Sequence, residues 1–279
     1  MKKILLSTLL FLNLNAFSAF VSPNDLAKSL DHPNLIILDV TKKEIYKQSH
    51  IEGAIYVDIT TFNKKNLQDS LRDFGINSNS DIVIYSRNTQ KSILASSYFA
   101  FTLIKNGLEH VSLLDGGYMA WVFEYMLQTS SKPFYAPQRG NIILEKSPIV
   151  VDKQFMQKSL FQLDILDARD SNEYYGITKS KGIKALGHIP SAKSSDYKNK
   201  FLKDNKLRDN NEIDKIYIMG YGLAKNKTIV VYANTILEAS MEWFILYKHL
   251  NFKNTKIYEG AYLEWGNDSN LRTTQFKWE

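Results

Sequence analysis

The feature that most constrains the fold is an internal duplication that covers most of the chain. A helix start capped by Ser22 recurs at Asp152, and both of these segments run on to the same Lys-Ser-Leu ending. An apolar stretch with a late aspartate, at 35–40, recurs at 164–169. A repeat of this length indicates an architecture in which one folding unit occurs twice.

The correspondence continues through three further segments, although the second copy has an insertion before its histidine. The matching pairs are His50–Ala54 with His188–Ala192, Ile82–Tyr85 with Ile229–Tyr232, and Leu114–Trp121 with Tyr258–Trp265. Short apolar strands alternate with helical segments in each copy. This pattern predicts α/β domains in which a parallel sheet has helices on both faces.

The joint between the copies is expected where periodicity disappears. The stretch from Gln128 to Ser147 is rich in turn-forming serine, proline and glycine, and a chain of 279 residues is long enough for two domains. The predicted organisation is a signal peptide at 1–19, an N-terminal domain at 20–127, a linker at 128–147, a C-terminal domain at 148–270 and a tail at 271–279.

Residues 1–19 have the pattern of a secretory signal. Two lysines precede an apolar run from Ile4 to Phe17, and small residues allow cleavage after Ser18 or Ala19. The run is too short for a comfortable membrane span, and no other long apolar stretch follows. We expect an exported protein, secreted or periplasmic, with no membrane span once the signal is removed.

Two features of the composition exclude classes of function. The formal net charge of +6 comes from scattered lysines and arginines without a nucleic-acid motif, so no nucleic-acid partner is expected. The chain has no cysteine, which excludes disulfides, thiolate metal sites and thiol nucleophiles. No histidine has a second ligand at metal spacing either, so we expect neither a metal nor a cofactor.

The turn after the strand at 229–232 is the candidate site. A helical pattern follows within a few residues, and a turn that leads into a helix N-terminus offers backbone N–H groups and a positive dipole end to an anion. Glu238 lies near that helix start, where capping is its simpler role. The candidate anion-binding residues of the loop are Ala233, Asn234, Thr235, Ile236, Leu237 and Glu238.

The ordered motifs resemble those of the rhodanese family, and specifically its tandem two-domain sulfurtransferases of the thiosulfate and 3-mercaptopyruvate type. Each copy has a strand ending in aspartate, a turn like Gly-His-Ile-Pro-x-Ala, a strand-Tyr-loop-helix unit and an (Asp/Glu)-Gly-(Gly/Ala)-x-x-x-Trp segment, and the match spans nearly all of 20–268. The resemblance implies two tandem domains, each with a parallel five-stranded sheet flanked by helices. It also implies a cysteine after the fourth strand of the second domain, which would accept sulfur from the donor and pass it to a thiol or cyanide.

The chain departs from the family pattern in that loop. Ala233 stands where the resemblance places the cysteine, and Ile236 stands where glycine is common. Ser86, which follows the matching strand of the first copy, is an unactivated hydroxyl and a poor substitute nucleophile. Either an engineered Cys→Ala change or natural loss of catalysis explains Ala233, and Ile236 favours natural loss because inactivation by design would not require a second change.

Several other polar residues have predicted roles. Arg169 aligns with an arginine that lies near the cleft in this family, where it would bind a carboxylate or sulfonate; the alternative is an ion pair with Asp170 or Glu173. Asp39 and Asp167, at strand ends, are expected to accept backbone hydrogen bonds. The histidines divide into a buried structural pair, His50 and His188, and three surface residues, His32, His110 and His249.

Two functions remain open from the sequence. The first is an exported, catalytically silent rhodanese-like protein that binds a small anion such as thiosulfate or sulfate, or a thiol-bearing protein, in the cleft between its domains. The alternative is a thiosulfate or 3-mercaptopyruvate sulfurtransferase in an inactivated Cys→Ala form. In either case the absence of sulfur at position 233 excludes persulfide chemistry and cysteine-dependent phosphatase or arsenate reductase activity.

Overall fold

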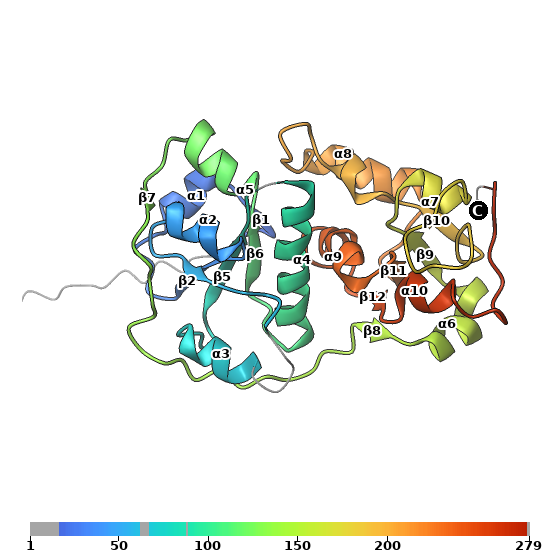
Figure 1. Cartoon of the computed structure of the whole chain (residues 1–279), viewed down its shortest axis with the longest axis horizontal. Helices are drawn as coiled ribbons and strands as arrows, with labels where there is room; N and C mark the ends of the chain where they lie inside the picture. Colours follow the sequence, from blue (N-terminus) through green and yellow to red (C-terminus); the bar gives the residue numbers. More distant parts are fainter. Residues whose placement is uncertain (1–16, 62–66, 88, 278–279) are drawn as a thin grey trace, which may run out of the picture.

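The computed structural model describes residues 17–61, 67–87 and 89–277, which form two α/β domains built on the same plan (Figure 1). Each domain contains a five-stranded sheet in which every pairing is parallel. The strand orders are β1-β6-β5-β2-β4 and β8-β12-β11-β9-β10, so the strands correspond one to one. The predicted duplication and fold class are confirmed. The predicted signal peptide lies almost entirely outside the described residues.

The elements of the first domain and its edge are β1 (Phe20–Val21), α1 (Pro23–Ala27), β2 (Leu35–Asp39), α2 (Lys43–Gln48), β3 (His50–Ile51), β4 (Ile55–Tyr56), α3 (Leu67–Asp73), β5 (Asp81–Tyr85), α4 (Gln90–Lys105), β6 (Val111–Leu114), α5 (Gly117–Met119), η1 (Ala120–Glu124) and β7 (Thr129–Ser130). Those of the second are β8 (Val150–Val151), α6 (Lys153–Ser159), η2 (Leu160–Gln162), β9 (Asp164–Asp167), α7 (Ser171–Tyr175), β10 (Ala192–Ser194), η3 (Tyr197–Lys200), α8 (Asn210–Asp214), η4 (Lys215–Gly220), β11 (Ile229–Tyr232), α9 (Ile236–Phe244), η5 (Ile245–His249), β12 (Thr255–Tyr258) and α10 (Ala261–Trp265).

Local sequence signals explain where the matching helices begin. The Ser22 side chain accepts a hydrogen bond from the Asp25 N–H, and Pro23 occupies the first turn of α1. Asp152 accepts one from the Phe155 N–H at the start of α6. Both predicted caps are therefore confirmed, and each satisfies a backbone donor that the helix itself leaves unpaired.

Side chains of the central strands alternate between two cores. In β5, Ile82 and Ile84 face one core, whereas Val83 and Tyr85 face another, as the period of a strand requires. The inner faces of the two sheets share a single apolar core, to which α4 and α9 both contribute. The outer faces have separate cores, covered by α1 and α5 in the first domain and by α6 and α10 in the second.

The shared core joins the domains through α4 and α9, which lie side by side at the centre of the molecule (Figure 1). Phe101 of α4 meets Trp243 of α9 edge-on, with ring centroids 5.0 Å apart. Phe20 also lies at this boundary, and its ring is 5.6 Å from that of His249. The surface position predicted for His249 is wrong: the residue is half-buried at the end of η5, and burial lowers its pKa.

The two buried histidines have matching structural roles. His50 stacks on Tyr46 and His188 stacks on Tyr174, each with ring centroids 3.8 Å apart. In each pair a ring nitrogen also hydrogen-bonds the carbonyl of its tyrosine. The structural role predicted for both histidines is confirmed.

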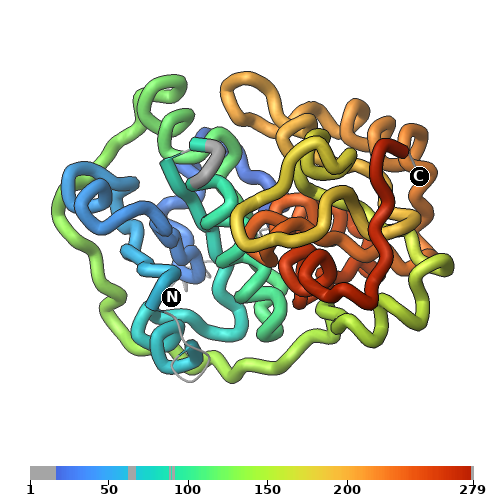
Figure 2. The backbone as a smooth tube through the Cα atoms, turned by 45° about the vertical axis from the view of Figure 1, so that its right-hand side comes forward, coloured from blue at the N-terminus to red at the C-terminus, as the bar shows by residue number. Residues whose placement is uncertain are grey.

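The connection between the domains wraps the first domain before it reaches the second (Figures 1 and 2). Its first part forms β7, which pairs antiparallel with β3, and residues 131–149 contain no helix or strand. Arg139 binds Asp69 and Asp73 of α3, at 2.6 and 2.8 Å. The Gly140 N–H donates to the Arg72 carbonyl at 2.7 Å. The segment is therefore held against α3 rather than extended into solvent.

Among the residues that the structure describes, no helix combines the length and apolarity that crossing a bilayer requires.

Candidate functional site

The candidate loop is a tight connection between β11 and α9. All four residues of β11 are buried, and the helix begins at Ile236 with Thr235 as its N-cap. Ala233 is fully buried, and its carbonyl accepts a hydrogen bond from the Tyr262 N–H at 2.8 Å. The predicted strand, turn and helix are thus present, and the first residue after the strand has only a methyl side chain.

Glu238 turns back onto the loop that precedes it. Its carboxylate accepts the Thr235 N–H at 3.1 Å, and the Thr235 hydroxyl accepts the Glu238 N–H, which makes a capping box. Burial raises the pKa of Glu238, and hydrogen bonds from the Thr235 and Asn234 N–H groups partly oppose that rise. The predicted capping role is confirmed. The Thr235 amide of the loop therefore faces a carboxylate of the same chain, and anion binding by the loop stays a prediction.

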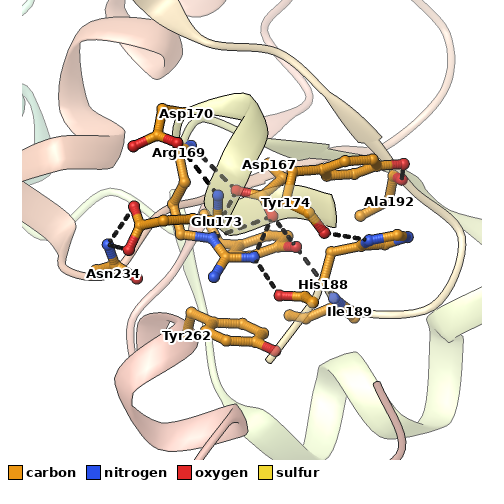
Figure 3. Close-up of polar contacts among 12 residues, drawn as sticks. Asp167, Arg169, Asp170, Glu173, Tyr174, His188, Ile189, Ala192, Asn234 and Tyr262 are labelled. Atoms are coloured by element: carbon orange, nitrogen blue, oxygen red, sulfur yellow. Dashed lines mark hydrogen bonds and ion pairs between the residues drawn. The ribbon is translucent and has the colours of Figure 1, made fainter. Parts of the chain in front are cut away.

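Asn234 is held by the neighbouring helix α7. Its amide nitrogen donates to both carboxylate oxygens of Glu173 at 3.0 Å and lies 3.1 Å from the Ser180 hydroxyl (Figure 3). The residue is 6% exposed. Its amide nitrogen therefore fixes the loop to α7, whereas its buried Oδ1 has no hydrogen-bond partner among the described residues. Ile236 and Leu237 are half-buried and pack against the shared core, whereas Thr235 is exposed.

Arg169 is buried and pairs with Asp167, so the ion pair expected with Asp170 or Glu173 is wrong, whereas ligand binding by Arg169 stays a prediction. Its guanidinium donates to Asp167 at 2.5 to 3.1 Å and to the Gly187 carbonyl at 2.7 Å (Figure 3). It also lies 3.7 Å from the ring centre of Tyr262. Burial alone lowers the pKa of Arg169, but the charge and hydrogen bonds of Asp167 outweigh it, and the pKa is raised.

The partners predicted for Arg169 have other roles. Asp170 caps α7 by accepting the N–H groups of Asn172 and Glu173. Glu173 accepts hydrogen bonds from Asn234 and from the Ser180 hydroxyl. Asp167 accepts the Arg169 N–H at 3.0 Å, which confirms the backbone hydrogen bond predicted for it; Asp39 accepts the Thr41 N–H in the same way, at 2.8 Å.

The first domain places a guanidinium at the same location from a different sequence position, a feature that sequence reasoning missed. Thr41 occupies the position equivalent to Arg169, and Arg87 supplies the charge. The guanidinium of Arg87 lies 3.6 Å from the ring centre of Tyr118 and donates to the carbonyls of Ile45 and Ser49. The sequence feature that could have indicated this arrangement is Arg87 itself, two residues after the tyrosine that ends β5.

A cavity of about 290 Å³ opens between the two domains. Its lining residues are Ile93 of α4 and, from the second domain, Tyr197, Lys198, Phe201, Leu202, Lys203 and Asn205. Burial raises the pKa of Tyr197 to about 12, with further contributions from the charges of Asp196 and Glu238. The sequence predicted a cleft between the domains but not these lining residues, because residues 197–205 match no motif of the first copy.

Comparison with known families identifies the two units. A family model described as a rhodanese-like domain matches residues 22–124 and 151–268. The chain belongs to the rhodanese-like family. The resemblance seen in the sequence is confirmed, and both copies of the duplication are rhodanese-like domains.

Curated relatives match across nearly the whole chain. The sulfur carrier protein TtuD of Thermus thermophilus is 26% identical over an alignment of 273 positions that covers 88% of this chain and 93% of that protein. A thiosulfate sulfurtransferase of Corynebacterium glutamicum is 28% identical, covering 88% and 87%. A 3-mercaptopyruvate sulfurtransferase of Escherichia coli O157:H7 is 23% identical, covering 92% and 98%. The chain is thus similar to two-domain sulfurtransferases along its length.

Solved structures show the same fold. YnjE superposes with a TM-score of 0.80 at 18% identity, covering 93% of this chain and 68% of that one. Wild-type EanB superposes with a TM-score of 0.79 at 21% identity, covering 92% and 69%. At this level of identity the likeness concerns the fold.

The chain nevertheless has no cysteine at any position. A persulfide is a sulfur atom added to a cysteine thiolate, so this chain has no atom on which to form one. Within the described part of the chain, no group of three or more histidine, aspartate or glutamate side chains is arranged to hold a metal ion.

Proposed function

We propose that this chain is an exported, non-catalytic member of the rhodanese-like family that binds a small anion in the cavity between its domains. The observation that carries the proposal is Ala233, a buried methyl group at the end of β11 in a chain without cysteine. The capping carboxylate of Glu238 supports it further, because a negative charge on the loop amides opposes the approach of a sulfur-donor anion.

The inter-domain cavity is the better anion site for this reason. Lys198 and Lys203 contribute ammonium groups to its lining, and Tyr197 and Asn205 contribute polar groups. The Lys198 ammonium is 3.8 Å from Asp196 and retains 43% side-chain exposure, so it can also reach a ligand. Cations beside a partly enclosed cavity favour a small oxyanion such as thiosulfate or sulfate. The alternative partner is a thiol-bearing protein that presents an anionic group to the same cavity.

Export is part of the proposal, and the start of β1 bears on the cleavage site. The Ala19 carbonyl accepts a hydrogen bond from the Leu113 N–H at 2.8 Å, and Ala19 is 7% exposed. Cleavage after Ser18 would retain this interaction, whereas cleavage after Ala19 would remove it. We therefore expect mature chains to begin at Ala19, which mass spectrometry of the exported protein would test.

The binding proposal is tested by titrating the mature protein with thiosulfate and with sulfate while following backbone amide NMR shifts. We expect shifts that saturate at millimolar anion and that centre on residues 197–205. Lys198→Gln/Lys203→Gln should weaken binding several-fold. Lys227→Gln should not, because Lys227 is exposed, precedes the N-terminal end of β11 and does not line the cavity. An absence of shifts at millimolar anion would contradict the proposal.

The alternative function is a sulfurtransferase inactivated by a Cys→Ala change. The full match to relatives of that name and the intact strand, loop and helix favour it. Ile236 and Glu238 oppose it, because the first leaves no glycine in the loop and the second places a carboxylate on the loop amides. Recovery of activity by Ala233→Cys alone would favour this alternative.

A further inference from the structure

A second cavity, of about 280 Å³, is lined by residues of the first domain and of the linker. Helix α2, which contributes to it, lies away from the contact between α4 and α9 (Figure 1). Residues of α2, of β4, of the end of α3 and of the linker surround it. Its lining residues are Lys43, Tyr46, Lys47, Ile55, Tyr56, Asp73, Phe74, Pro133, Phe134, Tyr135 and Ala136. Its volume is just below the roughly 300–1,000 Å³ that is usual for small-molecule sites, so it suits a small ligand.

The walls of this cavity are largely aromatic and are fixed by the fold. Tyr46 is 3% exposed, and its hydroxyl donates to the Ala54 carbonyl at 2.8 Å and accepts the Phe134 N–H at 3.1 Å. The second of these hydrogen bonds holds the linker against the first domain beside the cavity. Its ring centre is 5.5 Å from that of Tyr56. Such a surface favours a flat ring, through burial of apolar area and through ring-to-ring contacts.

The charge at the rim is positive. Lys43 and Lys47 are one helical turn apart on α2, and both are exposed. Within the part of the chain that the structure describes, neither ammonium is in an ion pair. The carboxylate in the lining, Asp73, is already paired with Arg139 at 2.8 Å. A ligand that enters therefore meets two lysines outside any ion pair beside an aromatic wall, although the charge of Lys43 also lowers the pKa of Asp58, after the hydrogen bonds from Thr60.

We propose that this cavity binds a small aromatic carboxylate. The ring would lie among Tyr46, Tyr56, Phe74 and Phe134, and the carboxylate would reach the Lys43 and Lys47 ammonium groups. One or two fused rings fit the volume. The site is independent of the cavity between the domains and of the loop at 233–238, so it stands or falls separately from the proposed function.

The proposal is tested on the mature protein with indole-3-acetate as the probe and indole-3-acetamide as its neutral analogue, by isothermal titration calorimetry. We expect indole-3-acetate to bind with a Kd below the millimolar range and the amide to bind about fivefold more weakly. Lys43→Gln/Lys47→Gln should remove most of that difference between the probes. Tyr135→Ala should weaken both probes several-fold, because Tyr135 lines the cavity but is 78% exposed and can be truncated without loss of the core.

A matched control is available in the second domain. Lys158→Gln/Phe161→Ala removes an exposed lysine and an aromatic ring that is 80% exposed, neither of which lines this cavity. We expect this variant to bind both probes like the unmodified protein. The proposal is overturned if indole-3-acetate does not bind at millimolar concentration, or if the control weakens binding as much as Tyr135→Ala. Binding of an acidic, tryptophan-containing peptide without binding of the free acid would also overturn it.

Discussion

Arg169→Ala is predicted to destabilise the protein strongly, because it breaks a buried ion pair. The guanidinium and the Asp167 carboxylate are 2% and 0% exposed, and 2.5 Å separates their closest atoms. Without the guanidinium, Asp167 retains the backbone N–H at 3.0 Å and the Tyr232 hydroxyl at 2.6 Å, but its charge has no counter-ion. Leaving one member of a buried pair in this way costs about 3–5 kcal/mol. For a chain of this size that corresponds to a fall in Tm of roughly 10 °C.

Urea denaturation followed by tryptophan fluorescence measures this loss as a change in the midpoint. The matched control is Arg272→Ala, which removes an exposed arginine and should change the free energy of unfolding by less than about 0.5 kcal/mol. Asp167→Asn/Arg169→Gln, which removes both charges, should lower the free energy of unfolding by less than the sum of the losses from the two single substitutions. The reasoning is refuted if Arg169→Ala lowers the free energy of unfolding by less than about 1 kcal/mol and instead abolishes anion binding.

Three further predictions concern the loop and the domain joint. Glu238→Ala should free the loop amides and strengthen thiosulfate binding at residues 233–238, at a cost of about 1 kcal/mol in stability from the lost cap; amide shifts there that do not differ from the unmodified protein would contradict this. Because the pKa of Glu238 is raised in the folded protein, its carboxylate is neutralised at a higher pH than that of a free glutamate. Anion binding to the loop should therefore strengthen as the pH falls through that pKa. Binding that does not change with pH would be inconsistent with this expectation. Trp243→Ala should cost about 3–5 kcal/mol and lower one common unfolding transition of both domains, because Trp243 is fully buried in their shared core; two separate calorimetric transitions would argue against that coupling.

The architecture could be predicted because its signals are local and occur twice. The caps at Ser22 and Asp152, the histidine turns and the strand-end aspartates each follow from a few neighbouring residues, and their repetition in order excludes coincidence. The capping role of Glu238 was predictable for the same reason, since it depends on a residue only three positions away.

The contacts of Arg169 could not be predicted, because its ion-pair partner depends on the three-dimensional arrangement of the strand end and helix α7. Asp170 and Glu173 follow Arg169 by one and four residues, which made them plausible partners from the sequence. In the structure each of them binds other groups, and the Arg169 guanidinium binds Asp167 instead. The replacement of that guanidinium by Arg87 in the first domain depends in the same way on a three-dimensional equivalence. The cavity beside α2 also lay beyond sequence reasoning, since the linker that closes it has no periodic pattern.

The absence of persulfide chemistry is tested most directly by a thiosulfate:cyanide sulfurtransferase assay on the mature protein. We predict no thiocyanate above background from the unmodified chain. The same assay on Ala233→Cys, Ala233→Cys/Ile236→Gly and Ala233→Cys/Ile236→Gly/Glu238→Ala identifies which loop residue prevents activity, and we expect activity only after the carboxylate of Glu238 is removed. Turnover by the unmodified chain would contradict the account, because it would require a sulfur acceptor other than cysteine.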